Sequence, residues 1–132
     1  MTNDTTGAMI RIKAADGHEL DCWMEPARGD RRGGLVILQE IFGVTDQLKR
    51  LAARYASLGY DGAIPAVFDR KESNAVIPFD EAPRGRDMML ASDLSETTAD
   101  VEAAVAALAA KGGGVAVMGF CWGGGLALRA AQ

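Results

Sequence analysis

The residues best placed to do chemistry form a short motif bracketed by glycines, Gly119-Phe-Cys121-Trp-Gly123. The motif lies between an apolar run typical of a buried strand, 115–118, and a stretch with helical character, 126–131. A nucleophile on a sharp strand-to-helix turn needs small residues two positions before and after it, because larger side chains would clash. Such a turn exposes the sulfur at a helix N-terminus, where the dipole and free N–H groups favour a thiolate. The spacing therefore predicts a nucleophile elbow with Cys121 at its tip, and favours it over a glycine-rich packing turn with an inert cysteine.

The other two residues that could take part in such chemistry are Cys22 and His18. Cys22 lies in an alternating run and is predicted to be a small buried or half-buried hydrophobe. His18 is the single histidine of the sequence and is predicted to be an exposed residue beside a turn. One histidine excludes zinc sites that need two imidazoles, and two cysteines far apart in sequence exclude a CxxC motif and a four-cysteine site. We therefore predict no metal and no cofactor.

The N-terminal part has the pattern of a polar tail followed by a β-hairpin. Residues 1–8 are polar, and two alternating runs, 9–13 and 19–24, flank the turn-forming pair Asp16-Gly17. The continuous apolar run 35–38 then predicts a strand buried on both faces of a parallel sheet.

Helical and extended segments alternate after that strand. A helix is predicted from an N-cap at Thr45 or Asp46 to a stop at Gly59, with apolar residues at helical spacing. A strand over 60–67, a long loop over 68–83 and the start of a helix over 84–93 follow.

The last segments before the motif complete the pattern. Thr97 with Asp100 resembles a capping box, and an apolar stripe follows until the glycines of 111–114 end the helix. The strand 115–118 leads into the elbow. A hairpin followed by alternating strands and helices predicts an α/β fold with crossover helices in one domain over 1–132.

Charge and hydropathy exclude several classes of partner. Lys plus Arg number 14 against 18 Asp plus Glu, a net charge of −4, and no basic block is present. Nucleic acid and anionic membranes are therefore disfavoured. No apolar run reaches the roughly 20 residues of a membrane helix. We expect a cytoplasmic protein with reduced thiols.

Two motifs together resemble one family. Gln39-Glu40-Ile41-Phe42-Gly43 follows the buried strand, and Gly119-Phe-Cys-Trp-Gly-Gly124 forms the elbow. This combination resembles the dienelactone hydrolases of the α/β-hydrolase superfamily, and the resemblance extends through essentially the whole chain. It implies the α/β-hydrolase fold, with an N-terminal hairpin followed by parallel strands with crossover helices, and this sequence is expected to be truncated after the nucleophile-elbow helix.

The resemblance also implies roles for individual residues. Cys121 is implied as the nucleophile that attacks the carbonyl of a small enol-lactone or ester, and Glu40 as the glutamate that helps to generate its thiolate. The backbone N–H groups of Ile41 and Trp122 are implied as the oxyanion hole. Arg86, with Arg84 as its close competitor, is implied to bind the carboxylate of the substrate.

The family's triad also needs an acid and a histidine, and 122–132 contains neither Asp nor His. We therefore expect the sequence to be the N-terminal part of a longer domain. The strand 115–118 would then form an exposed sheet edge, which is expected to pair with another copy, with a missing C-terminal piece, or in aggregates.

Two other functions remain open. A class I glutamine amidotransferase also has a GxCxG elbow, but it prefers His and Gln where Gly124-Gly125 stand here. A non-catalytic remnant that serves as an interaction module would retain the fold with an unreactive Cys121. A nicotinamide-binding domain is disfavoured because the motif lacks the GxG pair that lets the backbone approach a pyrophosphate.

Overall fold

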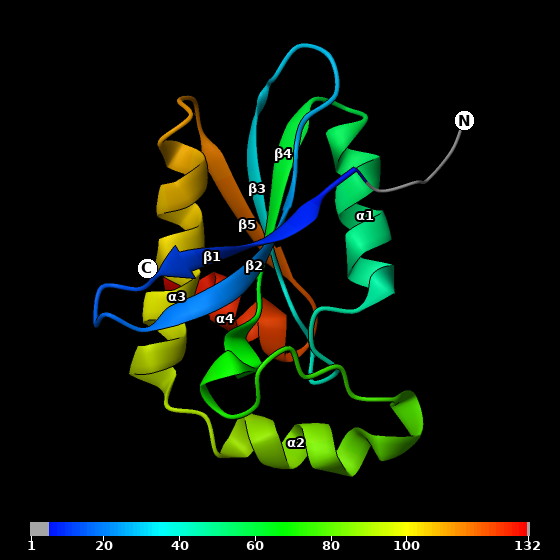
Figure 1. Ribbon diagram of the computed structural model, residues 1–132, viewed down its shortest axis with the longest axis vertical. Coiled ribbons are helices and arrows are strands. Elements are labelled where there is room, and N and C mark those ends of the chain that lie inside the picture. Colours follow the sequence, from blue (N-terminus) through cyan, green and yellow to red (C-terminus); the bar gives the residue numbers. More distant parts are fainter. Residues whose placement is uncertain (1–5, 132) are drawn as a thin grey trace.

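The computed structural model describes residues 6–131, and its centre is one mixed five-stranded sheet with the strand order β1-β2-β4-β3-β5 (Figure 1). The strands are β1 (Ala8–Lys13), β2 (Glu19–Glu25), β3 (Gly33–Leu38), β4 (Tyr60–Pro65) and β5 (Val115–Gly119). β3 runs parallel to both β4 and β5, whereas β2 is antiparallel to β1 and β4. The α/β architecture is therefore as predicted, and the hairpin joins the parallel strands through an antiparallel pair.

The predicted hairpin is confirmed, with Ile10 opposite Cys22. Gly17 has φ +91°, a left-handed conformation that glycine adopts without steric cost, so the Asp16-Gly17 pair forms the turn. The predicted tail was too long, because Ala8 already pairs with Met24 in the sheet. Residues 1–5 of that tail lie outside the described part of the chain.

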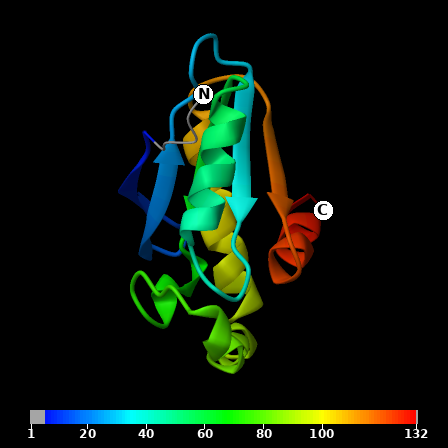
Figure 2. The same cartoon turned by 90° about the vertical axis from the view of Figure 1, so that its right-hand side faces the viewer.

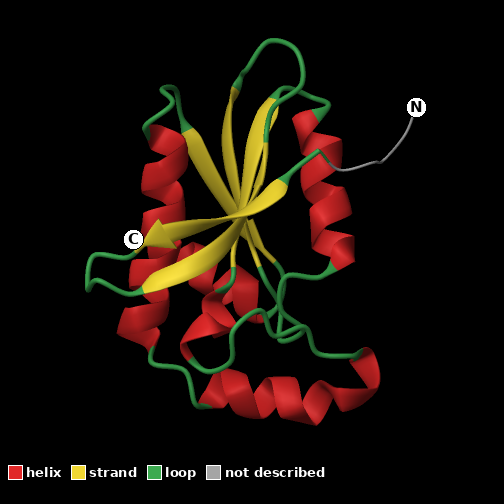
Figure 3. Ribbon diagram, in the orientation of Figure 1, coloured by secondary structure: helices red, strands yellow, loops and turns green. Residues whose placement is uncertain are grey.

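Helices cover both faces of the sheet (Figure 3). On one face, Leu35 and Ile37 of β3 pack against α1 (Asp46–Ala56) through Leu48 and Ala52. On the other face, the alternate residues of β3 pack against α3 (Leu94–Ala109) and α4 (Trp122–Ala131). β3 is buried along its whole length, as its apolar run predicted.

The start of α1 agrees with the prediction from the sequence, whereas the start of α3 differs from it. Thr45 is the N-cap of α1, with its hydroxyl oxygen accepting the Leu48 N–H at 3.3 Å. The Thr97–Asp100 start of α3 was wrong, because Asp93 is the N-cap and accepts the Glu96 N–H at 3.0 Å. Asp93 with Glu96 is itself a capping pair three residues apart, and it begins the helix one turn earlier.

The segment between β4 and α3 is more ordered than the predicted loop. The strand β4 ends at Pro65, two residues earlier than predicted, and two 3₁₀ turns, η1 (Val67–Arg70) and η2 (Phe79–Glu81), follow. The helix α2 (Ala82–Leu90) starts before the predicted 84–93. It lies below the carboxyl ends of β3 and β5, which Figure 2 shows from the side.

β5 forms one edge of the sheet, and its residues are half-buried or exposed. Among residues 6–131, no helix combines the length and the apolar character needed to cross a membrane.

Candidate active site

The turn between β5 and α4 has the strained geometry that the motif predicted. Cys121 has φ +52°, in the left-handed region, and the residue is exposed to solvent. A non-glycine residue in this conformation costs roughly 1–2 kcal/mol. The turn carries this residue directly from β5, which ends at Gly119, into the first residue of α4, Trp122. Strain at a solvent-facing cysteine on a strand-to-helix turn is typical of a nucleophile elbow.

The two glycines of the elbow are required by close backbone contacts. A Cβ on Gly119 would lie 2.2 Å from the carbonyl carbon and oxygen of Gly123. A Cβ on Gly123 would lie 2.6 Å from the Leu38 carbonyl oxygen and 2.7 Å from that of Gln39. The elbow therefore packs directly on the carboxyl end of β3, where the loop with Glu40 begins.

Gln39 fixes the start of that loop and is not among the site residues predicted from the sequence. Its side chain is fully buried. The Oε1 atom accepts the Val67 N–H at 3.1 Å, and the Nε2 atom donates to the Glu40 carbonyl oxygen at 3.1 Å. The available signal was a polar residue directly after a strand buried on both faces, where an unpaired amide would be costly.

The other side of the loop is held by two close glycine contacts. A Cβ on Gly43, which has φ +88°, would lie 2.0 Å from the Ala75 carbonyl oxygen. A Cβ on Gly85 of α2 would lie 2.2 Å from the Ile41 carbonyl oxygen. The loop is thus in close contact with Ala75 at Gly43 and with α2 at Ile41.

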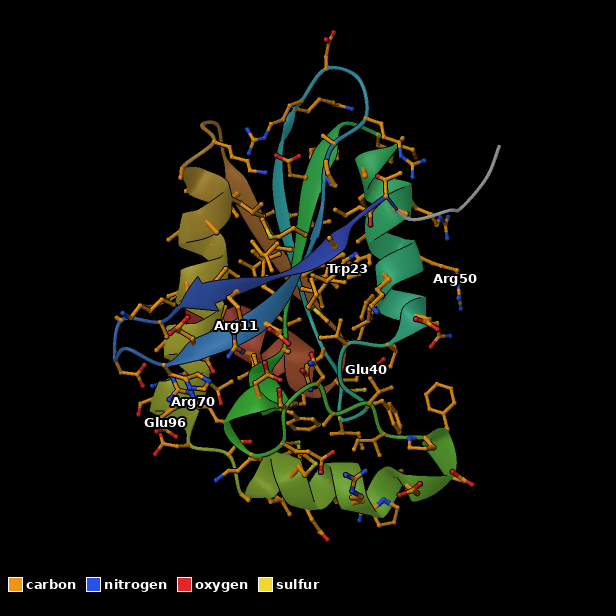
Figure 4. The ribbon with its side chains drawn as sticks, viewed as in Figure 1. Arg11, Trp23, Glu40, Arg50, Arg70 and Glu96 are labelled. Atoms are coloured by element: carbon orange, nitrogen blue, oxygen red, sulfur yellow. The ribbon has the colours of Figure 1, made fainter. Side chains whose placement is uncertain are left out.

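Cys121 and Glu40 line the same cleft, of about 710 Å³. Phe120 also lines it, and α1 supplies the remaining wall through Gln47, Leu48, Arg50, Leu51 and Arg54. In Figure 4, Glu40 is seen on the loop after β3 and Arg50 projects from α1 above it. The structure therefore brings together the two implied catalytic side chains.

The implied oxyanion donors lie on either side of this junction. Trp122 is the first residue of α4, and the N–H groups of a helix's first turn have no acceptor within the helix. Its ring stacks on Phe68 with 5.3 Å between centroids, which anchors the start of the helix. Ile41 lies in the loop that Gln39 and Gly85 hold in place.

The two arginines implied to bind substrate are not among the residues that line this cleft. One Arg84 guanidinium nitrogen contacts both carboxylate oxygens of Glu72, at 2.6 and 2.8 Å, and the hydrogen bond to Glu72 raises the pKa of Arg84. Arg86 is exposed on α2 and has no ion pair or hydrogen bond with any residue in the described range.

The single histidine lies in the hairpin turn, away from the residues that line the cleft. It was expected to be exposed but is half-buried, and its Nε2 atom is buried without a hydrogen-bond partner in the described part of the structure. The turn is held against α3, because Arg70 binds Asp16 and the fully buried Asp100, each at 2.9 Å. Folding of the hairpin onto α3 accounts for the burial of His18.

Neither Cys22 nor a cluster of acidic side chains forms a second candidate site in the described part of the chain. Cys22 is fully buried, as predicted, and burial raises the pKa of its thiol to about 12. Within residues 6–131, no group of three or more His, Cys, Asp or Glu side chains could hold a metal ion.

Comparison with known proteins gives the family. Residues 22–132 match the dienelactone hydrolase family. A carboxymethylenebutenolidase from a Pseudomonas species is 40% identical over 130 residues, covering 92% of this chain and 54% of that protein. A carboxymethylenebutenolidase from Rhodococcus opacus is 38% identical over 97 residues, covering 74% of this chain and 37% of that protein.

A solved structure shows the same fold. The crystal structure of a putative dienelactone hydrolase from Klebsiella pneumoniae superposes with a TM-score of 0.73 at 22% identity, over 94% of this chain and 55% of that one. The present chain thus spans about half the length of the Pseudomonas relative and of this structural neighbour.

Proposed function

Since this chain belongs to the dienelactone hydrolase family, we propose that it forms the nucleophile-bearing part of a hydrolase that cleaves a small enol-lactone or carboxylic ester. The observation that carries the proposal is that Cys121 is exposed in a strained backbone conformation and lines the same cleft as Glu40. A glycine turn that served packing alone would not need a non-glycine residue at φ +52° with its side chain in solvent.

The proposed reaction begins with the thiolate of Cys121 attacking the carbonyl carbon of the substrate. The C–S bond forms, and the negative charge moves to the carbonyl oxygen, which accepts hydrogen bonds from the N–H groups of Ile41 and Trp122. Collapse of this intermediate breaks the ester C–O bond and leaves an acyl thioester on the sulfur, while the leaving oxygen departs as an alkoxide or enolate and takes up a proton. Water then hydrolyses the thioester and regenerates the thiol.

The residues that line the cleft account for only part of the proton transfer that the reaction needs. Glu40 lines the cleft and is proposed to accept the thiol proton as the substrate binds. Hydrolysis of the thioester needs a general base to activate water. The single histidine lies in the hairpin and does not line the cleft, so we propose that the triad Asp and His are supplied by residues outside this sequence.

The alternatives make different predictions about the same thiol. An interaction module without catalysis has no need of a reactive Cys121, and a class I glutamine amidotransferase would release ammonia from glutamine. The loop 39–43 and the glycines after Gly123 favour the ester hydrolase. Both lie within residues 22–132, which match the dienelactone hydrolase family.

Hydrolysis of a dienelactone and of p-nitrophenyl acetate by this chain and by Cys121→Ser tests the proposal. We expect a rapid first turnover with the unchanged chain and loss of that phase in the variant. Equal rates for both proteins would contradict the proposed hydrolase and favour a non-catalytic module.

We also propose a second copy of this chain as the partner of the β5 edge. One side of β5 pairs with β3, and the other has no neighbouring strand among residues 6–131. Exposed edge strands present unpaired N–H and C=O groups that pair readily with another strand. Light scattering at rising concentration should show dimers or larger species, and a monodisperse monomer would contradict this partner.

The proposed compartment is the cytoplasm. Both cysteines are free, and one is buried while the other is exposed, so they cannot pair with each other in this fold. Thiols in this state suit a reducing environment.

A further inference from the structure

One short segment contacts both of the regions that carry the implied oxyanion donors. It is η1, whose four consecutive residues are each attached to a different part of the molecule. The Val67 N–H is bound by the Gln39 side chain, and the Phe68 ring stacks on Trp122. The first contact leads to the loop after β3 and the second to the elbow, so η1 joins the two sides of the candidate oxyanion hole.

The other two residues of η1 fix the segment itself. The Asp69 carboxylate accepts the Asp21 N–H of β2 at 2.8 Å and the Asn74 N–H at 2.7 Å. Arg70 donates two hydrogen bonds to the fully buried Asp100 of α3, at 2.9 and 3.0 Å. A segment bound to a strand and to a helix in this way is a fixed support for the side chains that contact it.

The connection to Ile41 is a buried amide that binds a backbone carbonyl. Gln39 Nε2 donates to the Glu40 carbonyl oxygen at 3.1 Å, and the Gly43 N–H reaches the same oxygen at 3.3 Å. This carbonyl and the N–H of Ile41 belong to one peptide group, which is planar and trans. The hydrogen bond from Gln39 therefore fixes the direction of the Ile41 N–H as well.

The connection to Trp122 is an aromatic stack within a small apolar cluster. The Phe68 ring is fully buried and lies 5.3 Å from the Trp122 ring, with 25° between their planes. Phe42, the residue after Ile41, packs against the same cluster. Phe68 thus belongs to a cluster that borders the peptides of both implied donors.

We propose that η1 sets the separation and direction of the two oxyanion donors, and that Gln39 and Phe68 are the positioning residues that connect it to them. The inference rests on the proposed function, because it concerns the charge that develops on a carbonyl oxygen during acyl transfer. Donors stabilise that charge when they lie about 2.7–3.1 Å from the oxygen, so a small displacement of either peptide weakens the effect. Neither Gln39 nor Phe68 lines the cleft, so both act through the backbone that they hold.

Two reactions of the same thiolate separate oxyanion stabilisation from the reactivity of the thiol. With p-nitrophenyl acetate, the C–S bond forms, negative charge develops on the carbonyl oxygen, and the C–O bond then breaks to release p-nitrophenolate. With iodoacetamide, the sulfur displaces iodide from a saturated carbon, and no charge develops on a carbonyl oxygen. The ratio of the acylation rate to the alkylation rate at Cys121, followed by peptide mapping, therefore reports the action of the donors.

The variants each remove one connection. Gln39→Met keeps the length of the side chain and removes both of its hydrogen bonds, and Phe68→Leu removes the stacked ring. Phe68→Tyr keeps that ring. Leu108→Val is the matched control, because Leu108 is fully buried beside Gly34, at the other end of β3 from Gln39. Circular dichroism verifies that each variant folds.

We expect Gln39→Met and Phe68→Leu each to lower the ratio about ten-fold, less than the roughly 100- to 1000-fold that follows loss of a whole oxyanion donor. Phe68→Tyr should recover most of what Phe68→Leu loses. Leu108→Val should change the ratio by less than about two-fold, since distant sites act independently. A merely structural role for Gln39 and Phe68 would lower both rates together and leave the ratio as it is.

The proposal fails if Cys121 reacts with both reagents and neither variant lowers the ratio more than Leu108→Val does. The nucleophile stands in that case. If Gln39→Met does not fold, the comparison of Phe68→Leu with Phe68→Tyr tests the proposal alone. If the folded, unchanged chain is alkylated at Cys121 but is never acylated there, the proposed function fails as well.

Discussion

The two cysteines of this chain lie in regions with opposite properties. Cys22 is in the middle of β2, is fully buried, and packs in the core between the sheet, α3 and α4. Cys121 is on the turn from β5 to α4, is exposed, and has a backbone conformation that side chains rarely adopt. The first region is relaxed and closed to solvent, and the second is strained and open.

The difference shows how one fold makes one thiol inert and the other available. Burial disfavours the charged form of Cys22 and raises its pKa to about 12, so its thiolate is scarce at neutral pH. Cys121 is lifted out of the core by the sharp turn, which the glycines on each side allow. The geometry of the turn therefore accounts for the different exposure of the two cysteines.

The largest expected effect comes from filling the space that keeps the elbow sharp. Gly123→Ala would place a Cβ 2.6 Å from the Leu38 carbonyl oxygen, so the backbone of β3 or α4 must move. We expect a loss of about 3 kcal/mol in the free energy of unfolding, measured by urea denaturation.

Gly125→Ala is the matched control, because a Cβ at that position of α4 would have no atom within 4 Å beyond its chain neighbours and the nearby backbone of its own helix. Alanine is a better helix former than glycine, so this variant should gain about 0.5–1 kcal/mol. Equal losses in the two variants would show that the elbow does not depend on close packing.

A second prediction compares serine at the two cysteine positions. Cys22→Ser buries a hydroxyl among apolar side chains and should lower the free energy of unfolding by about 2 kcal/mol. Cys121→Ser keeps an exposed polar group and should change it by less than about 0.5 kcal/mol. A large loss in Cys121→Ser would contradict the exposed position of the elbow.

The raised pKa of Cys22 predicts a loss of stability in alkaline solution. In the folded chain the pKa lies near 12 against an ordinary value of 9.0, so the stabilising contribution is complete below pH 9 and is lost as the pH rises toward 12. Between pH 8 and pH 10, the unchanged chain should lose about 1.4 kcal/mol more than Cys22→Ala, which shares every other titrating group. Parallel pH dependences for the two proteins, followed by urea denaturation, would show that Cys22 ionises freely in the folded state.

The smallest expected effect concerns the strain at the elbow. Cys121→Gly removes the steric cost of φ +52° and should be more stable than Cys121→Ala by about 1 kcal/mol. Thermal and urea unfolding of the two variants provide the measurement. An alanine variant as stable as the glycine variant would mean that the turn relaxes in solution.

The sequence predicted the parts of the molecule that local patterns determine. The hairpin, the buried strand β3, the Thr45 cap and the strand–turn–helix at Cys121 each follow from periodicity or from glycine spacing. Contacts between distant segments could not be predicted in this way. The burial of His18 depends on the hairpin folding onto α3.

The same distinction applies to the candidate site. The motifs identified Cys121 and Glu40, which share one cleft. The role of Gln39 depends on an N–H from η1, and the wall formed by Arg50 depends on how α1 packs against the sheet. Spacing along the chain carries no information about either contact.

Acyl transfer to Cys121 is the most direct test of the central claim, that the elbow presents this thiol as a nucleophile. The folded chain is treated with p-nitrophenyl acetate, and the acetylated residue is located by peptide mass mapping. We expect p-nitrophenolate release with one acetyl group on Cys121, none on Cys22, and no such adduct in Cys121→Ala. Acetyl groups found only on lysines, or a folded chain whose Cys121 stays unmodified while the unfolded chain reacts, would contradict it.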